Sequence, residues 1–183
     1  VKNLDVPLFI NTHEILKVGD VLYVCNTSTD TIGIYNLKTD ENKFLDVKEG
    51  GFVDNIVNND DVYHRDSKHV NSLFYVDNKL YYCCHNRGKQ LSEYYSFDTV
   101  TNQIEKISEN GNSSHGVVVH ENHLYSLGTR GRRLLRINLE DKELGRVRLS
   151  EVRGVKGQVA ALKAAAAQAT TPWFFAVPGK LNV

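Results

Sequence analysis

The chain has 183 residues, with 22 basic and 22 acidic side chains and a formal net charge of zero at pH 7. This balance provides no basic field for nucleic acid, and no apolar run approaches the ~20 residues that span a bilayer, so we expect neither nucleic acid nor a membrane as a partner. The charge is unevenly distributed, because residues 1–66 hold 6 basic and 12 acidic side chains and residues 67–183 hold 16 and 10.

One sequence pattern occurs three times along the chain. Each copy has a histidine, an apolar run, a polar turn, a Leu-Tyr pair and a further hydrophobic segment. The copies begin at His13, His69 and His115 and cover residues 13–47, 69–107 and 115–149. Such periods are typical of stacked or radial repeats.

Each copy predicts four short strands. In the first copy they are residues 15–18, 21–26, 32–37 and 43–47, which are rich in β-branched and aromatic residues and separated by Gly, Asp, Asn, Ser or Thr. Four short antiparallel strands in one unit are typical of a β-propeller blade. We therefore predict an all-β fold, a partial β-propeller of about three four-stranded antiparallel blades within residues 1–151.

Propellers close into rings of about four to eight blades. We therefore expect the remaining blades to come from a missing segment or from another chain, unless the three blades form an open stack of sheets.

The repeat pattern fades after residue 149. Residues 155–169 are dominated by strong helix formers and predict a helix, and residues 173–177 predict a buried strand. We interpret residues 152–183 as a helix plus strand, the truncated start of a second, α/β domain.

The three cysteines are Cys25, Cys83 and Cys84. We expect buried, reduced thiols rather than a disulfide. No signal peptide precedes the first copy, so we expect a cytoplasmic protein.

The three repeated histidines are the first candidate site. His13, His69 and His115 each stand at the start of a predicted innermost strand, where a closed ring would direct them toward a common axis. Three roles are open: packing against the neighbouring blade, contact with a ligand, or ligation of zinc or another divalent metal. We expect no other cofactor.

Basic loops on the same rim are the second candidate site. Arg87 and Lys89 lie in one loop between second and third strands, and Arg130 and Arg132 lie in another. Guanidinium groups bind oxyanions with two hydrogen bonds, so these loops suit a carboxylate, a phosphate or a sulfated sugar. Solvated hairpin loops are the alternative interpretation.

An insert, residues 48–68, separates the first two copies. Asp60, Asp61, His64 and Asp66 within it suit a hard cation such as calcium, although their spacing is not that of an EF-hand. A polar surface loop is the alternative.

Residues His69–Leu73 with Asp77–Tyr81, and His115–Val119 with Leu124–Tyr125, resemble blades of NHL-type and related six-bladed propellers over about residues 10–150. The resemblance implies a binding platform, a lyase or a hydrolase. We also count Asn71 among the ligand-binding candidates. Relatives such as the peptidylglycine amidating lyase hold zinc with one histidine from each of three inner strands, a placement that His13, His69 and His115 resemble. Residues 171–180 are similar to the opening of a glycosyltransferase-like α/β module.

Two functions remain open from the sequence. The first is a ligand-binding or interaction platform for a small molecule, a glycan, another anionic ligand or a protein, attached to a glycan-modifying domain. The second is a metal-dependent lyase or hydrolase with a three-histidine site in the propeller channel.

Overall fold

The computed structural model describes residues 11–53, 66–130 and 133–145, together with Lys163 and Ala167. The chain divides into two compact units, Val1–Arg146 and Val147–Val183. Lys163 and Ala167 are both helical, in agreement with the helix predicted over residues 155–169. The predicted strand at 173–177 lies outside the described residues.

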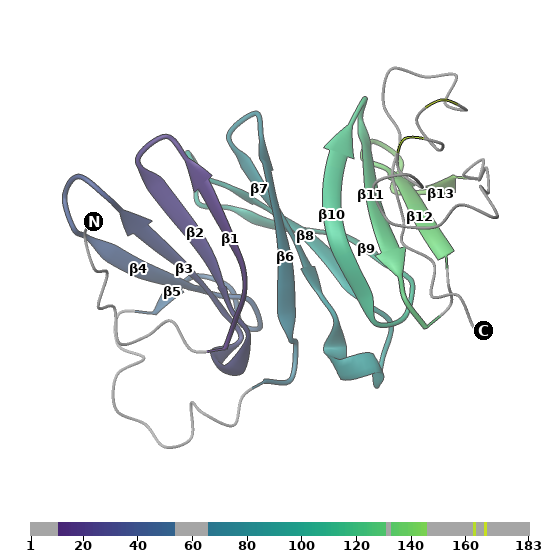
Figure 1. Cartoon of the computed structure of the whole chain (residues 1–183), viewed down its shortest axis with the longest axis horizontal. Helices are drawn as coiled ribbons and strands as arrows, with labels where there is room; N and C mark the ends of the chain where they lie inside the picture. The colour runs from purple at the N-terminus through teal and green to yellow at the C-terminus, as the bar shows by residue number, and fades with distance from the viewer. Residues whose placement is uncertain (1–10, 54–65, 131–132, 146–162, 164–166, 168–183) are drawn as a thin grey trace. The chain divides into compact units, whose positions relative to one another are not determined.

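The first unit contains three separate antiparallel sheets, which we call blades 1, 2 and 3 (Figure 1). In each blade, every strand pairs with the next one along the chain. Blade 1 consists of β1 (Thr12–Val18), β2 (Val21–Asn26), β3 (Thr31–Asn36), β4 (Asn42–Asp46) and β5 (Phe52–Val53). Blade 2 consists of β6 (Val70–Val76), β7 (Lys79–Cys84), β8 (Glu93–Asp98) and β9 (Ile104–Glu109). Blade 3 consists of β10 (Ser114–His120), β11 (His123–Gly128), β12 (Arg133–Asn138) and β13 (Leu144–Gly145).

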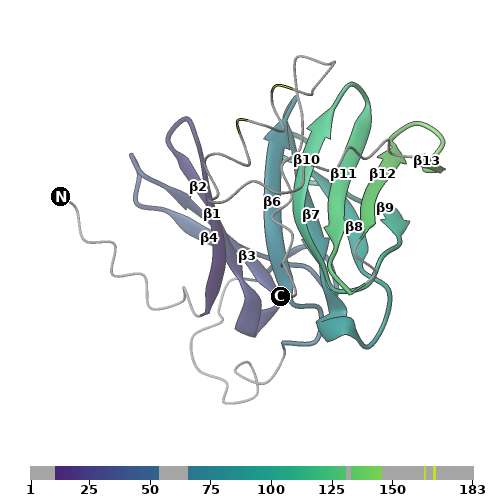
Figure 2. The same cartoon turned by 45° about the vertical axis from the view of Figure 1, so that its right-hand side comes forward.

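This architecture confirms the predicted fold class of four-stranded antiparallel blades. Blade 1 differs by the short fifth strand β5, which comes from the predicted insert. The first strands of the blades are neighbours, since β6 contacts both β1 and β10 (Figures 1 and 2). Among the described residues, no helix is long and apolar enough to cross a membrane.

Blade 2 is buried on both faces, and β7 shows how its sequence achieves this. Leu80, Tyr82 and Cys84 belong to the apolar core shared with blade 1. Tyr81 and Cys83 belong to the core shared with blade 3. Successive side chains of a strand point to opposite faces, so a strand that packs on both sides is apolar at every position.

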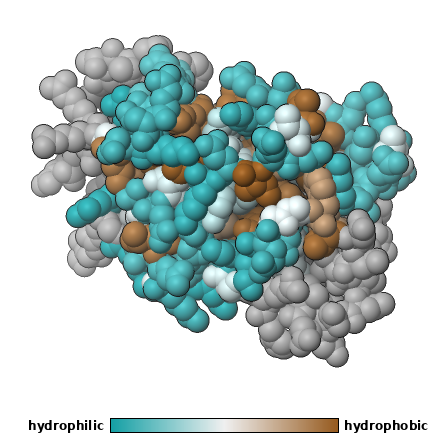
Figure 3. Space-filling view, turned by 180° about the vertical axis from the view of Figure 1, so that it is seen from behind, coloured by the Kyte–Doolittle hydropathy of each residue, from teal (hydrophilic) through white to brown (hydrophobic). Residues whose placement is uncertain are grey.

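The exposed surface is mostly hydrophilic outside these cores. Seen from behind, apolar side chains gather near the middle of the face, with hydrophilic ones around them (Figure 3).

Cys25, Cys83 and Cys84 are buried free thiols, as predicted. Burial raises the pKa of each of these thiols, so they stay protonated and behave as small apolar side chains.

One carboxylate joins blade 1 to the segment that begins blade 2. Asp30 is 1% exposed and follows η1 (Thr27–Thr29), the short 3-10 turn between β2 and β3. Its Oδ2 accepts hydrogen bonds from the backbone N–H and the hydroxyl of Ser67, both at 2.8 Å, and its Oδ1 accepts the backbone N–H of His69 at 2.8 Å. The N–H of Lys68 lies between the two oxygens, at 3.0 and 3.1 Å. Asp30 therefore fixes the backbone on which His69 stands.

Further side-chain hydrogen bonds connect the inner strands. Oε2 of Glu14 on β1 accepts the N–H of Leu73 on β6 at 2.7 Å. The hydroxyl of Ser72 on β6 accepts the N–H of Gly116 on β10 at 2.7 Å. Glu14 and Ser72 each stand four residues before the end of their strand, so equivalent positions of two blades make equivalent links.

We predict that Asp30→Ala lowers the free energy of unfolding by about 2–3 kcal/mol, because several backbone and hydroxyl donors lose a charged acceptor at once. Urea unfolding measures this change. The matched control is Asp20→Ala, which removes an exposed carboxylate that pairs with the exposed Lys38, and it should cost less than about 1 kcal/mol. Equal losses in the two variants would contradict the role assigned to Asp30.

Candidate functional site

Four imidazole rings from the three blades form a continuous row, which we call the imidazole row: His13, His69, His85 and His115. The ring centroids of His13 and His69 are 4.8 Å apart. Those of His69 and His85, and of His85 and His115, are each 4.9 Å apart. The structure therefore brings the three predicted histidines to one place, but it does so through a fourth.

The row lies at the end of the blades where the inner strands begin. His13 is in β1, His69 immediately precedes β6, and His115 is in β10. His85 stands between β7 and η3 (Asn86–Gly88), the short 3-10 turn drawn at the lower end of blade 2 in Figure 1.

The strand register corrects the predicted equivalence of the three histidines. His13, Asn71 and His115 each stand five residues before the end of their strand. The register shifts at or beside each of these positions, so every inner strand carries a β-bulge there. His69 lies two residues earlier, at the position held by Asn11 and Ser113 in the other blades.

The backbone supports this corrected alignment. Asn11, His69 and Ser113 have φ angles of 51°, 54° and 52°, the left-handed conformation that residues other than glycine seldom adopt. In each blade, a residue in the left-handed conformation is followed by a β-bulge, and together they direct the chain into the inner strand. His69 therefore enters the row from this turn, whereas His13 and His115 enter it from the bulge.

A carboxylate orients His69. Its Nδ1 lies 2.8 Å from Oδ1 of Asp66, which fixes an Nδ1–H tautomer and leaves Nε2 without its proton when the ring is neutral. The other oxygen of Asp66 lies 3.5 Å from the guanidinium of Arg87. Arg87 and His69 thus share one carboxylate.

An amide orients His115 in the opposite sense. The side-chain amide of Asn71 donates to Nδ1 of His115 at 3.1 Å and to the backbone carbonyl of Ser114 at 3.0 Å. Because Nδ1 accepts, neutral His115 carries its proton on Nε2. Asn71 thus positions His115, and its predicted contact with a ligand stays a prediction.

His85 is the least basic member of the row. Burial lowers its pKa to about 4, with further lowering by the neighbouring His115, His69, Arg130 and His13. Its Nδ1 is buried without a hydrogen-bond partner among the described residues. A buried polar nitrogen of this kind is costly unless a ligand, a proton or water satisfies it.

The flanking imidazoles are also held neutral. Burial lowers the pKa of His13, with a second contribution from His69, while Asp66 acts in the opposite direction. Burial likewise lowers the pKa of His115, followed by the effects of His69 and His13. At neutral pH His13, His85 and His115 therefore present uncharged rings.

Three of the four predicted rim cations lie close to the row. The guanidinium of Arg130 donates to the backbone carbonyl of Gly88 at 3.0 Å, linking blades 3 and 2. Arg87 and Lys89 line a hollow of about 370 Å³ with Asp66, Ser67, Lys68, Asn86 and Gln90. Arg132 lies outside the described residues, as do Asp60, Asp61 and His64 of the predicted calcium site.

Gly88 allows the rim loop to pack closely. Its φ is +66°, and a Cβ there would lie 2.6 Å from the Ser113 hydroxyl and 2.8 Å from the Arg130 guanidinium. Any other side chain would displace Arg130 from the loop.

Within the described ranges, no three or more His, Cys, Asp or Glu side chains are arranged to hold a metal ion. The opposed tautomers of His69 and His115 show one reason. Nδ1 of each ring is already engaged by a protein group, so only the Nε2 atoms remain to ligate a metal. The ring contacts also run from His69 to His115 through His85.

His85 and Asp66 belong to the site without having been predicted there. The sequence predicts no role for His85 and places Asp66 in the cation site of the insert. The sequence feature that could have identified His85 is its position directly after β7, which keeps its ring beside the inner strands.

The sequence matches no family model, and the search of curated proteins gave no match. Among solved structures, the β-propeller domain of the Trilobed protease from Pyrococcus furiosus, with an open velcro topology, is similar at 17% identity with a TM-score of 0.48. The match covers 75% of this chain and 42% of that one. The computationally designed Ika8 protein is similar at 10% identity (TM-score 0.39; 74% and 48% covered) and a luciferin-regenerating enzyme at 13% (TM-score 0.39; 74% and 58% covered). The chain thus spans about half the length of these structures, and its NHL-type character stays a prediction.

We predict that His85 makes folding stability depend on pH. A folded-state pKa below the unfolded value of about 6.5 means that stability is complete above pH 6.5 and falls as pH drops toward 4, because the unfolded chain takes up the proton first. Urea unfolding at about pH 7 and pH 5 should show a loss in the native chain that is smaller in His85→Gln. The control is His123→Gln, which removes an imidazole that pairs with Arg136 on blade 3. An equal pH dependence in the native chain and in both variants would contradict this prediction.

Proposed function

We propose that the three blades form a ligand-binding platform for an anionic small molecule or glycan, which binds at the imidazole row and the adjacent cations Arg87, Lys89 and Arg130. The observation that carries this proposal is the convergence of four imidazoles from three blades beside these cations. The carboxylate of Asp66 lies beside them and is already engaged by His69 and Arg87.

The protonation state of the row favours an anion as the ligand. Neutral His115 presents an Nε2–H donor, and the guanidinium groups supply charged donors for phosphate or carboxylate oxygens. Binding of an anion would raise the pKa values of imidazoles that burial now lowers. Ligand binding is therefore coupled to proton uptake, and the affinity rises as pH falls.

The residues outside the described ranges extend the proposal. A glycan-modifying domain begun by residues 152–183 would act on the molecule that the blades retain. A protein partner, with an acidic segment reaching the same rim, is the alternative occupant.

We also propose a cytoplasmic location, which the three buried free thiols support.

We predict saturable binding of inorganic phosphate and of D-glucuronate, which isothermal titration calorimetry measures, with higher affinity near pH 5.5 than near pH 7.5. Arg130→Glu should weaken both by about tenfold or more, because one charge-assisted contact becomes a repulsion. Arg87→Glu should act in the same direction.

Lys17→Glu is the matched control, because it makes the same charge reversal at an exposed residue near the other end of β1. It should leave both affinities unchanged. Unaltered binding in Arg87→Glu and Arg130→Glu would contradict the proposed rim site.

The second candidate is a metal-dependent lyase or hydrolase at His13, His69 and His115. The Asp66–His69 pair supports it, since a carboxylate often orients a metal-binding histidine. The spread of the row over four rings and the engaged Nδ1 atoms favour the platform instead.

We predict that treatment with a chelator leaves the unfolding midpoint and phosphate binding unchanged, because the platform needs no zinc or calcium. Elemental analysis and thermal unfolding before and after chelation measure this. Near-stoichiometric zinc that disappears in His69→Ala would contradict the platform and support the metal-dependent enzyme.

A further inference from the structure

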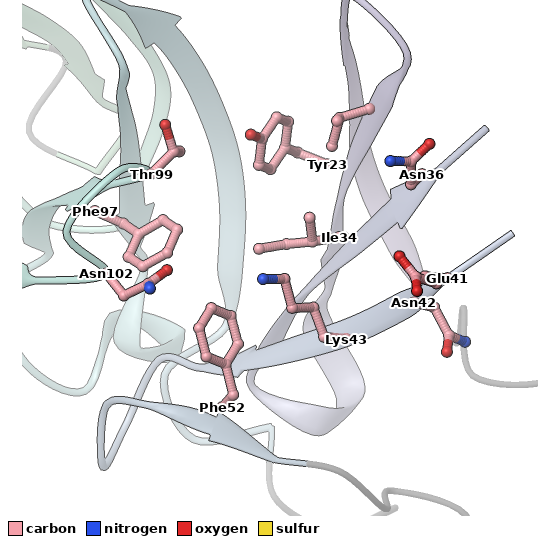
Figure 4. A pocket seen from close by; sticks show the side chains of 11 residues that line it. Tyr23, Ile34, Asn36, Glu41, Asn42, Lys43, Phe52, Phe97, Thr99 and Asn102 are labelled. Carbon is pink, nitrogen blue, oxygen red and sulfur yellow. The ribbon is translucent and has the colours of Figure 1, made fainter. Parts of the chain in front are cut away.

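A pocket between blades 1 and 2 lies apart from the imidazole row. It has a volume of about 520 Å³, within the range of small-molecule sites, and extends toward the opposite end of the strands (Figure 4). One wall comes from β2, β3, β4 and β5 of blade 1. The other comes from β8 and the turn that follows it in blade 2.

The inner surface of this pocket is apolar and aromatic. The rings of Phe52 and Phe97 meet edge to face, with centroids 5.9 Å apart. Ile34 and the ring of Tyr23 continue this surface on blade 1 (Figure 4). Such a surface favours a ligand with an apolar or aromatic body.

One cation points into the pocket. The ammonium of Lys43 lies 4.5 Å from the centre of the Phe52 ring and is directed toward the blade 2 wall (Figure 4). In the part of the chain that the structure describes, Lys43 is itself exposed and forms no ion pair with a carboxylate, whereas the likewise exposed Lys38, Lys48 and Lys142 do. A ligand carboxylate would supply the missing partner.

Polar groups on the two walls complete the pocket. Thr99 and Asn102 face Lys43 from blade 2 (Figure 4). Glu41 lines the far side, where its carboxylate accepts a hydrogen bond from the Thr39 hydroxyl at 3.0 Å. This fixed negative charge disfavours a second acidic group on the ligand.

We propose that this pocket binds a small amphipathic monocarboxylate, whose carboxylate pairs with Lys43 and whose apolar body contacts Phe52 and Phe97. The site is independent of the imidazole row, since the two share no residue. Its ligand class also differs, because the row offers hydrophilic donors and the pocket offers aromatic faces.

The test is a titration with 3-phenylpropionate, followed by ¹H–¹⁵N NMR. We expect saturable shifts of the amides of Phe52, Phe97, Thr99 and Asn102. Lys43→Met should raise the dissociation constant by about tenfold, the loss of one charge-assisted contact, whereas Lys43→Arg should retain binding. The neutral analogue 3-phenylpropan-1-ol should bind about tenfold more weakly to the native chain.

Lys17→Met is the matched control, because it removes an exposed lysine of the same blade outside the pocket, and it should bind like the native chain. The proposal is overturned if no saturable shift occurs at roughly 10 mM ligand, or if Lys43→Met binds like the native chain. Unaltered binding of phosphate in Lys43→Met would show that the imidazole row and the pocket act separately.

Discussion

The structure depends on how separate sheets are held at fixed positions relative to one another. Among the described residues, adjacent blades share no ladder of strand hydrogen bonds, so their alignment rests on two apolar cores and on side chains that bind the backbone of the next blade. The carboxylate of Asp30 is the most highly connected of these side chains, because it accepts hydrogen bonds from three successive residues ending at His69. Apolar packing alone is non-directional, whereas such hydrogen bonds determine register. The place of His69 beside His13 follows from this constraint.

The imidazole row shows how burial and nearby charge set the chemistry of a site. Desolvation is the largest cause of the lowered pKa of His13, His85 and His115, and mutual proximity of the rings adds to it. Asp66 and Asn71 then select opposite tautomers for His69 and His115. The result is a polar surface beside Arg87 and Arg130 in which His13, His85 and His115 are uncharged at neutral pH. These three rings gain charge when they take up a proton. The carboxyl group of Glu93 shows the opposite balance. Burial alone would raise its pKa, but hydrogen bonds from Lys106 and Lys68 lower this pKa to about 2.

The sequence predicted the strands and the blades well, because alternating apolar residues and polar turns determine them locally. The hairpin residues Asp77 and Asn78, for example, both adopt the positive φ that their side chains tolerate. The equivalence of the histidines was predicted incorrectly, although the spacing carries a signal: the Leu-Tyr pair begins nine residues after His13 and His115 but eleven after His69. The role of His85 and the pocket around Lys43 were missed for a different reason. Both arise from contacts between blades, and the packing of one repeat against the next is not encoded within a single repeat.

The central claim is that imidazoles from three sheets meet in one row. The most direct measurement is a NOESY spectrum of the full chain with assigned histidine ring protons. We expect cross-peaks between the rings of His13 and His69, of His69 and His85, and of His85 and His115, whose centroids are 4.8–4.9 Å apart. Absence of the cross-peaks that link His85 to its two neighbours would contradict the row, and with it the proposed binding platform.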